Sequence, residues 1–224
     1  MARQLTEQEI VERFDSALAG NNIYVCYQAQ MNHATNRMVG SEALMRWEDP
    51  EHGAQYPSDF IPVLEQNDLI FRADLFVFEE VCRLQKFCLD KGIVPVPISV
   101  NMSRYDIYHD HKYVEEIEKI RQKYQVPVHL LRIEITESSA IGGTDLILSV
   151  LKNLPDHLYV VEMDDFGSGY SSLNILKDLD VDIIKLDMNF LNGRIGGRGG
   201  TIISSMVQMT KWLNTPVIAE GVET

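Results

Sequence analysis

The sequence has few cysteines, no long apolar run and a shortage of cations. Its 3 cysteines, Cys26, Cys82 and Cys88, form no CxxC pair, which argues against a zinc-thiolate or redox site and for reduced thiols. No segment approaches the roughly 18 consecutive apolar residues of a membrane helix, and MARQLTEQEI lacks the apolar core of a secretory signal. We therefore expect a cytoplasmic location, either alone or as the cytoplasmic part of a larger, membrane-anchored protein.

The shortage of cations also limits the partners. The 20 Lys and Arg residues face 33 Asp and Glu residues, for a formal net charge of −13. A surface of that charge repels the phosphate backbone, so we expect no binding to a DNA or RNA polymer.

The chain has the length and composition of one soluble domain, residues 1–224, with 45% hydrophobic and 24% charged residues. Residues 1–20 predict a leading amphipathic helix, because Thr6 and Glu9 have the spacing of a capping box and apolar residues recur at helical intervals behind them. Residues 23–30 and 38–46 predict two strands, which the short NHATN segment would join as an antiparallel hairpin.

After the hairpin, predicted helices and strands alternate. Strands are expected at residues 94–103, 130–137, 158–166, 181–187 and 215–224, with helices near 58–66, 72–90, 112–124, 145–154, 171–179 and 202–213. Apolar strands that alternate with helices are typical of a mostly parallel α/β sheet. With the hairpin there are seven predicted strands, one fewer than the eight of a (β/α) barrel.

Acidic or amide side chains stand at the carboxyl end of nearly every predicted strand, where active sites of parallel α/β folds form. Residues two apart on a strand share a face, whereas the adjacent Asp164 and Asp165 would reach one site only if the strand ended there, at a bend supplied by Gly167–Gly169. The polar residues at these strand ends are Glu42 and Arg46, Asn101, Glu134 and Glu137, Asp164 and Asp165, Lys185 and Asp187, and Glu220 and Glu223.

So many carboxylates at one end of a sheet would repel one another without cations between them. Oxygen donors with no paired His or Cys favour Mg²⁺ or Mn²⁺ over zinc, and two such ions would support displacement at a phosphorus atom by water. Lys185 is the lysine placed among these acids; it would orient the water or neutralise charge, or else form a structural salt bridge with Asp187 or a neighbouring acid.

Several motifs in one order resemble the EAL-domain cyclic-di-GMP phosphodiesterases of bacteria. They are EAL at Glu42–Leu44 followed by MRW, NMS at Asn101–Ser103, EITES at Glu134–Ser138, DDFGSGYSSL at Asp164–Leu173, KLD at Lys185–Asp187 and AEGVET at Ala219–Thr224. The resemblance implies a modified TIM barrel with one antiparallel strand, which hydrolyses cyclic di-GMP to linear pGpG with Mg²⁺ or Mn²⁺. The family continues past AEGVET through a further helix and strand to a QGY motif, so we expect this chain to lack that segment and to have reduced activity.

The resemblance also implies roles for individual residues. Lys185 would position the attacking water, Glu220 or Glu223 would act as base or support, and Glu137 would steady the loop after Phe166. The implied metal ligands are Glu42, Asn101, Glu134, Asp164, Asp165 and Glu220, and the expected substrate contacts are Gln28, Leu44, Arg46 and Asp187. Arg46 suits a phosphate because its planar guanidinium can donate two parallel hydrogen bonds.

Two other functions remain open. A catalytically weak or inactive receptor or scaffold domain would bind cyclic di-GMP without turnover, and a structural barrel fragment would bind neither metal nor nucleotide but would leave the acidic strand ends unexplained. The parent protein could carry sensory or GGDEF-type domains, and homodimers are frequent in the family.

Overall fold

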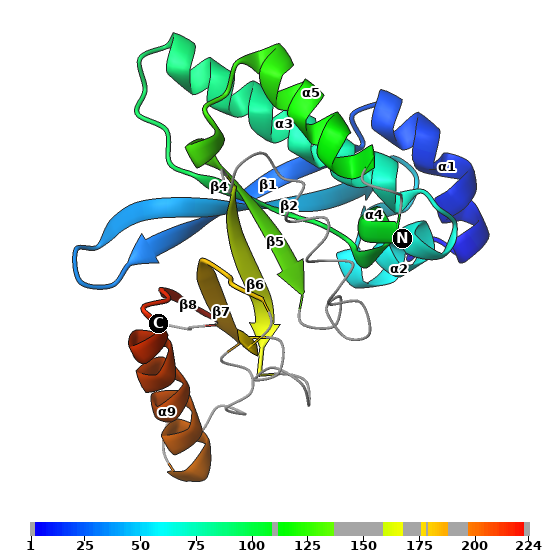
Figure 1. The fold of residues 1–224 in the computed structure, drawn as a ribbon. Helices are drawn as coiled ribbons and strands as arrows, with labels where there is room; N and C mark the ends of the chain where they lie inside the picture. The colour runs from blue at the N-terminus through cyan, green and yellow to red at the C-terminus, as the bar shows by residue number, and fades with distance from the viewer. Residues whose placement is uncertain are drawn as a thin grey trace. The chain divides into compact units, whose positions relative to one another are not determined.

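The computed structural model describes residues 3–108, 112–136, 159–167, 176–177, 179–187 and 197–221 (Figure 1). The chain divides into two compact units, Met1–Leu131 and Arg132–Thr224, which are described separately. None of the helices in the described ranges has the length and apolarity that a membrane crossing requires. The prediction of a single domain stays a prediction.

The first unit begins with the expected amphipathic helix, α1 (Glu7–Ala19). The capping box is confirmed: Thr6 Oγ1 accepts a hydrogen bond from the backbone N–H of Glu9, while the Glu9 carboxylate accepts one from the Thr6 N–H. Ile10, Phe14 and Ala17 are buried on one face of this helix, so helical periodicity correctly identified the face that packs on the core.

The predicted hairpin is also confirmed. Strands β1 (Ile23–Asn32) and β2 (Arg37–Asp49) pair antiparallel, and β2 pairs in parallel with β4 (Ile98–Asn101) on its other side. A short strand, β3 (Gly53–Gln55), pairs with the end of β2 and was not predicted from the sequence. Strand β4 is shorter than the predicted 94–103, because prolines at 95 and 97 have no N–H to donate to a ladder.

Helices cover the odd-numbered face of β2. Trp47 is 1% exposed, and its ring centroid lies 6.5 Å from that of Phe14 in α1 and 5.6 Å from that of Phe60 in α2 (Pro57–Gln66). Helix α3 (Ile70–Asp90) packs along α5 (Lys112–Tyr124), as Figure 1 shows. The short helices α4 (Arg104–Tyr108) and η1 (Val128–Leu130) complete the unit. The even-numbered face of β2 carries the predicted site residues Glu42, Leu44 and Arg46.

The second unit contains four parallel strands in the order β5, β6, β7 and β8. They are β5 (Leu131–Thr136), which starts at the last residue of the first unit, β6 (Val160–Phe166), β7 (Ile183–Asp187) and β8 (Val217–Glu220). Helix α9 (Gly197–Leu213), orange to red in Figure 1, connects the last two strands. Parallel neighbours joined through a helix agree with the predicted α/β architecture.

Strand β6 has an irregularity that the sequence did not predict. The strand ends at Phe166, as predicted, but its pairing with β7 shifts between Met163 and Phe166. Two residues of β6, Asp164 and Asp165, therefore lie opposite the single residue Lys185, which is the arrangement of a β-bulge. The predicted helix at 145–154 and most of the one at 171–179 lie outside the described residues.

Candidate active site

The candidate site in the second unit lies on one face of the parallel strands. In a parallel ladder, paired residues project to the same side of the sheet. Glu134 is paired with Glu162, Thr136 with Asp164, and Asp187 with Glu220. The apolar residues between them, such as Ile133, Met163 and Ile184, are buried on the opposite face. Strand alternation thus separates an apolar core face from a face that carries carboxylates.

Lys185 is at the centre of this face. Its side chain is 1% exposed, and its ammonium group contacts three carboxylates from three different strands. Nζ lies 2.8 Å from Oε1 of Glu220 and 3.3 Å from Oδ1 of Asp164, and it also donates a hydrogen bond to Glu134, which is fully buried. A buried ammonium needs compensation of this kind, because an isolated charge is costly to remove from water.

Because of the bulge in β6, two adjacent acids, Asp164 and Asp165, lie opposite the single residue Lys185 of β7. Asp165 adopts a φ of 55°, in the left-handed region that Asp tolerates better than most residues, and Gly167 follows with a φ of 98°. Asp164 is partly buried and contacts Lys185, whereas Asp165 is exposed. Positive φ values thus occur at Asp165, within the acidic pair, as well as at Gly167, where the predicted bend begins.

Strand periodicity would also have found two residues that the sequence analysis missed. Glu162 is two residues before Asp164, and Arg132 is two residues before Glu134, so both project toward the site face. Nη1 of Arg132 donates a hydrogen bond to Oε1 of Glu162 at 2.8 Å, and the carboxylate is fully buried. Because Glu162 is the direct neighbour of Glu134, this ion pair balances a second buried carboxylate beside the Lys185 cluster.

The first unit places its own predicted residues on one face of the β1, β2 and β4 ladder. Gln28 pairs with Glu42 in the hairpin, Glu42 pairs with Ser99 of β4, and alternation puts Leu44 and Asn101 on that same side. Glu42, Leu44 and Asn101 are half-buried, and Gln28 is exposed.

Arg46 shares this face by alternation. Its guanidinium donates a 2.8 Å hydrogen bond to the backbone carbonyl of Met45. Two predicted site residues, Glu137 and Glu223, lie outside the described residues.

The donor set of the second unit fits a hard divalent cation. Glu134, Asp164 and Glu220 supply carboxylate oxygens, and Oδ1 of Asp164 is buried without accepting a hydrogen bond from any described residue. Mg²⁺ and Mn²⁺ prefer such oxygen ligands.

Asp49, Glu51 and His52 also bring ligand atoms within 4.8 Å of one another. There, however, Asp49 Oδ1 already accepts hydrogen bonds from the backbone N–H groups of Glu51 and His52 and lies 2.8 Å from His52 Nδ1. That group is better explained as a hydrogen-bonded turn.

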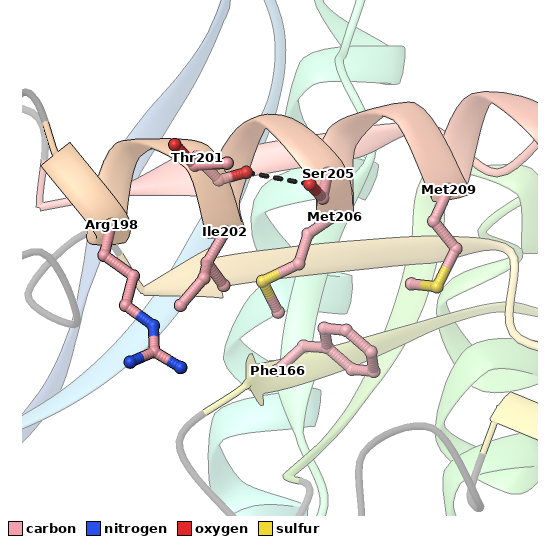
Figure 2. A pocket seen from close by; sticks show the side chains of 7 residues that line it. All are labelled: Phe166, Arg198, Thr201, Ile202, Ser205, Met206 and Met209. Carbon is pink, nitrogen blue, oxygen red and sulfur yellow. Dashed lines mark hydrogen bonds between the residues drawn. The ribbon is translucent and has the colours of Figure 1, made fainter.

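A pocket of about 560 Å³ lies elsewhere in the second unit, between α9 and the end of β6. Figure 2 shows Ile202, Met206 and Met209 of α9 directed toward Phe166, with Arg198 at one side. The described lining contains no carboxylate. Its chemistry is therefore that of an apolar surface, unlike the face around Lys185.

Comparisons with known proteins agree with this geometry. The family model described as "EAL domain" matches residues 11–224. The chain is 34% identical, over 96% of its length, to the bifunctional diguanylate cyclase/cyclic di-GMP phosphodiesterase MucR of Pseudomonas aeruginosa, and 29% identical, over 90%, to the cyclic di-GMP phosphodiesterase PA2567 of the same organism. It spans 32% and 34% of these two relatives, about one third of their length.

Solved structures show the same fold. The phosphodiesterase of MucR in complex with c-di-GMP superimposes with a TM-score of 0.88 at 33% identity, covering 96% of this chain and 87% of that one. An EAL domain protein from Listeria monocytogenes gives a TM-score of 0.80 at 27% identity, covering 100% of this chain and 85% of that one.

Proposed function

Because the chain belongs to the EAL domain family, whose members include c-di-GMP phosphodiesterases, we propose that it hydrolyses cyclic di-GMP to linear pGpG with the help of Mg²⁺ or Mn²⁺. The observation that carries the proposal is the buried Lys185 ammonium, held by Glu134, Asp164 and Glu220 at the carboxyl-terminal part of four parallel strands. A purely structural barrel would not need to bury the Lys185 ammonium and the Glu134 carboxylate beside two further, partly exposed carboxylates.

In this proposal the carboxylates hold the metal ions, expected to be two. Glu134, Asp164, Asp165 and Glu220 would bind through oxygen, and the resemblance adds Glu42 and Asn101 to the ligand set. When bound, divalent ions lower the pKa of coordinated water and offset the negative charge of a phosphodiester.

The residues of the chain then orient the reactants. Lys185 would donate hydrogen bonds to the attacking water and hold it in line with the scissile bond, because its ammonium is fixed by three carboxylates. The water oxygen forms a bond to phosphorus as the bond from phosphorus to the ribose 3′ oxygen breaks. Glu220 or Glu223 would accept the proton of the water, the 3′ oxygen takes up a proton, and the product is linear pGpG. Glu137 would support the loop that follows β6.

Substrate contacts are proposed for Gln28, Leu44 and Arg46 of the hairpin and for Asp187 of β7. Arg46 would exchange its hydrogen bond to the Met45 carbonyl for a bidentate contact with a phosphate of the dinucleotide. The relatives are longer than this chain, and the name of one includes a diguanylate cyclase. The proposal therefore includes a GGDEF-type or sensory domain in the parent protein. It also includes homodimerisation and a cytoplasmic location, which the sequence analysis expected.

The test is a turnover assay with cyclic di-GMP and Mn²⁺ or Mg²⁺, in which pGpG is separated by chromatography. It should be run on the chain and on a fusion that supplies the family's QGY segment. We expect metal-dependent pGpG formation that Lys185→Met abolishes and that the exposed-lysine control Lys211→Met leaves intact. Tight binding of cyclic di-GMP with no pGpG from either form would instead identify a receptor domain.

A further inference from the structure

Three carboxylates from three helices converge on Ser103, two residues after the proposed metal ligand Asn101. The backbone N–H of Ser103 donates to Oδ2 of Asp106 in α4 at 3.0 Å and lies 3.4 Å from Oδ2 of Asp74 in α3. Its hydroxyl donates to Oε1 of Glu65 in α2 at 2.8 Å. The end of β4 is therefore attached through one serine to three separate helices.

Helix capping explains one of these acids. Ser103 caps α4: its hydroxyl accepts from the N–H of Tyr105 at 3.2 Å, and its carbonyl accepts from the N–H of Asp106 at 3.0 Å. The Asp106 side chain returns a contact to the Ser103 N–H, as the third residue of a capping box does. Asp74 is not part of this cap, so its burial beside Asp106 requires another reason.

Asp74 and Asp106 are 6% and 1% exposed, and their carboxyl groups lie within hydrogen-bonding reach of each other. Burial raises the pKa of Asp74 well above its usual range, and the negative charges of Asp106 and Glu65 raise that pKa further. Arg104, next to Ser103, places its guanidinium 5.1 Å from the ring centre of Tyr105 and hydrogen-bonds to the hydroxyl of that residue. Two buried carboxyls this close together repel each other when both are ionised.

We propose that Asp74 is a positioning residue for the metal-dependent reaction: it shares a proton with Asp106, and the pair holds Ser103 and thereby the strand end that carries Asn101. The inference rests on the proposed function in that it assigns Asn101 to the metal site. Glu65 holds the Ser103 hydroxyl from the other side. In this arrangement the neutral carboxyl supplies a hydrogen bond, and an ionised one would repel its neighbour.

The direction of the pH effect follows from the raised pKa of Asp74. Between the ordinary pKa of an aspartic acid and the raised value in the fold, the native state binds more protons than the unfolded state. Stability contributed by the pair is present at low pH and is lost as pH rises through the raised value. The hydrogen bonds that fix Ser103, and through it the position of Asn101, should weaken over the same pH range.

Two substitutions at one position test the idea. Asp74→Asn keeps a neutral hydrogen-bond donor and cannot ionise, whereas Asp74→Ala removes the group. Mn²⁺ affinity, measured by electron paramagnetic resonance from pH 6 to pH 9, should stay within about twofold of wild type at pH 7 for Asp74→Asn and fall about tenfold for Asp74→Ala, the lower end of the range for residues that support metal ligands. Asp90→Asn, the same change at an exposed position of α3, is the matched control.

The pH series separates positioning from packing. As pH rises through the raised pKa of Asp74, wild-type Mn²⁺ affinity should decline relative to that of Asp74→Asn. Urea unfolding without metal should show the same difference, and this measurement needs neither metal binding nor catalysis, so it tests the proton-sharing pair even if no pGpG is formed. Equal losses for Asn and Ala would overturn the proposal, as would an Ala variant that is less stable but binds Mn²⁺ normally when folded.

Discussion

Replacing Lys185 by methionine tests the central electrostatic claim. Methionine nearly matches the length and volume of the lysine stem, so the change removes the charge with little loss of packing. In wild type the ammonium lies 2.8 Å from Glu220 and 3.3 Å from Asp164 and also contacts Glu134. Unit charges 4 Å apart attract by about 4 kcal/mol at an effective dielectric constant of about 20, and desolvation cancels part of that attraction.

We expect Lys185→Met to lower the free energy of unfolding by about 3–5 kcal/mol, the cost of removing one partner from a buried ion pair. The variant leaves Glu134 fully buried without its ammonium partner. The assay is urea unfolding followed by circular dichroism, first in a chelator and then with saturating Mn²⁺. Because a bound cation would replace part of the lost positive charge, Mn²⁺ should stabilise the variant more than it stabilises wild type.

The reasoning would be refuted by a loss below about 1 kcal/mol in chelator, a value typical of a surface ion pair. Lys185→Arg provides a second measurement if the methionine variant does not fold. Arginine keeps the charge but not the position of the ammonium, so it should fold and yet fail to produce pGpG. An arginine variant as active as wild type would remove Lys185 from the proposed role in positioning water.

Two further predictions concern backbone strain and thiol reactivity. Gly167→Ala should destabilise on the order of 2–3 kcal/mol, more than Gly92→Ala, because φ at Gly167 is +98°, outside the left-handed well near the +67° of Gly92. The Met206 Cε atom would lie 2.6 Å from the added Cβ, but it ends a flexible side chain that can move away, so the backbone strain at Gly167 should account for the difference. Equal losses of melting temperature for the two variants would contradict the prediction. Burial raises the pKa of the Cys82 thiol to about 12, whereas Cys26 is exposed. At pH 8.5, iodoacetamide should therefore label Cys26 in the native protein and Cys82 only in urea. Rapid labelling of Cys82 in the native protein, detected by mass spectrometry of peptides, would show that this thiol is not buried as the structure has it.

Most elements of this fold could be predicted because their signals are local. Helix α1 has its capping box and its apolar stripe within residues 6–19, and the hairpin is indicated by two β-rich segments around a short turn. Strand β3, of three residues, was missed because its pairing with Trp47–Asp49 depends on where the end of β2 projects. A strand so short has no periodicity of its own to detect.

The candidate site was predicted in outline for a similar reason. Polar residues at successive strand ends included Glu134, Asp164, Lys185 and Glu220, which the structure brings into contact. Their roles in metal binding and catalysis stay predictions. The ion pair between Arg132 and Glu162 was overlooked because attention went to strand ends, although each residue lies only two positions before a predicted ligand.

The sequence by itself determined the excess of negative charge, which follows from composition alone. It also determined the alternation of helices and strands and the positions of carboxylates along the strands, because these depend on neighbours a few residues apart. Only the tertiary structure decided the bulge that sets Asp164 and Asp165 opposite Lys185, the burial of that lysine, and the convergence of Asp74 and Asp106 on Ser103. These features arise from ladder register and helix packing between segments about 20 to 50 residues apart. In the low-dielectric surroundings created by that packing, the interactions between these charges are stronger than they would be in water.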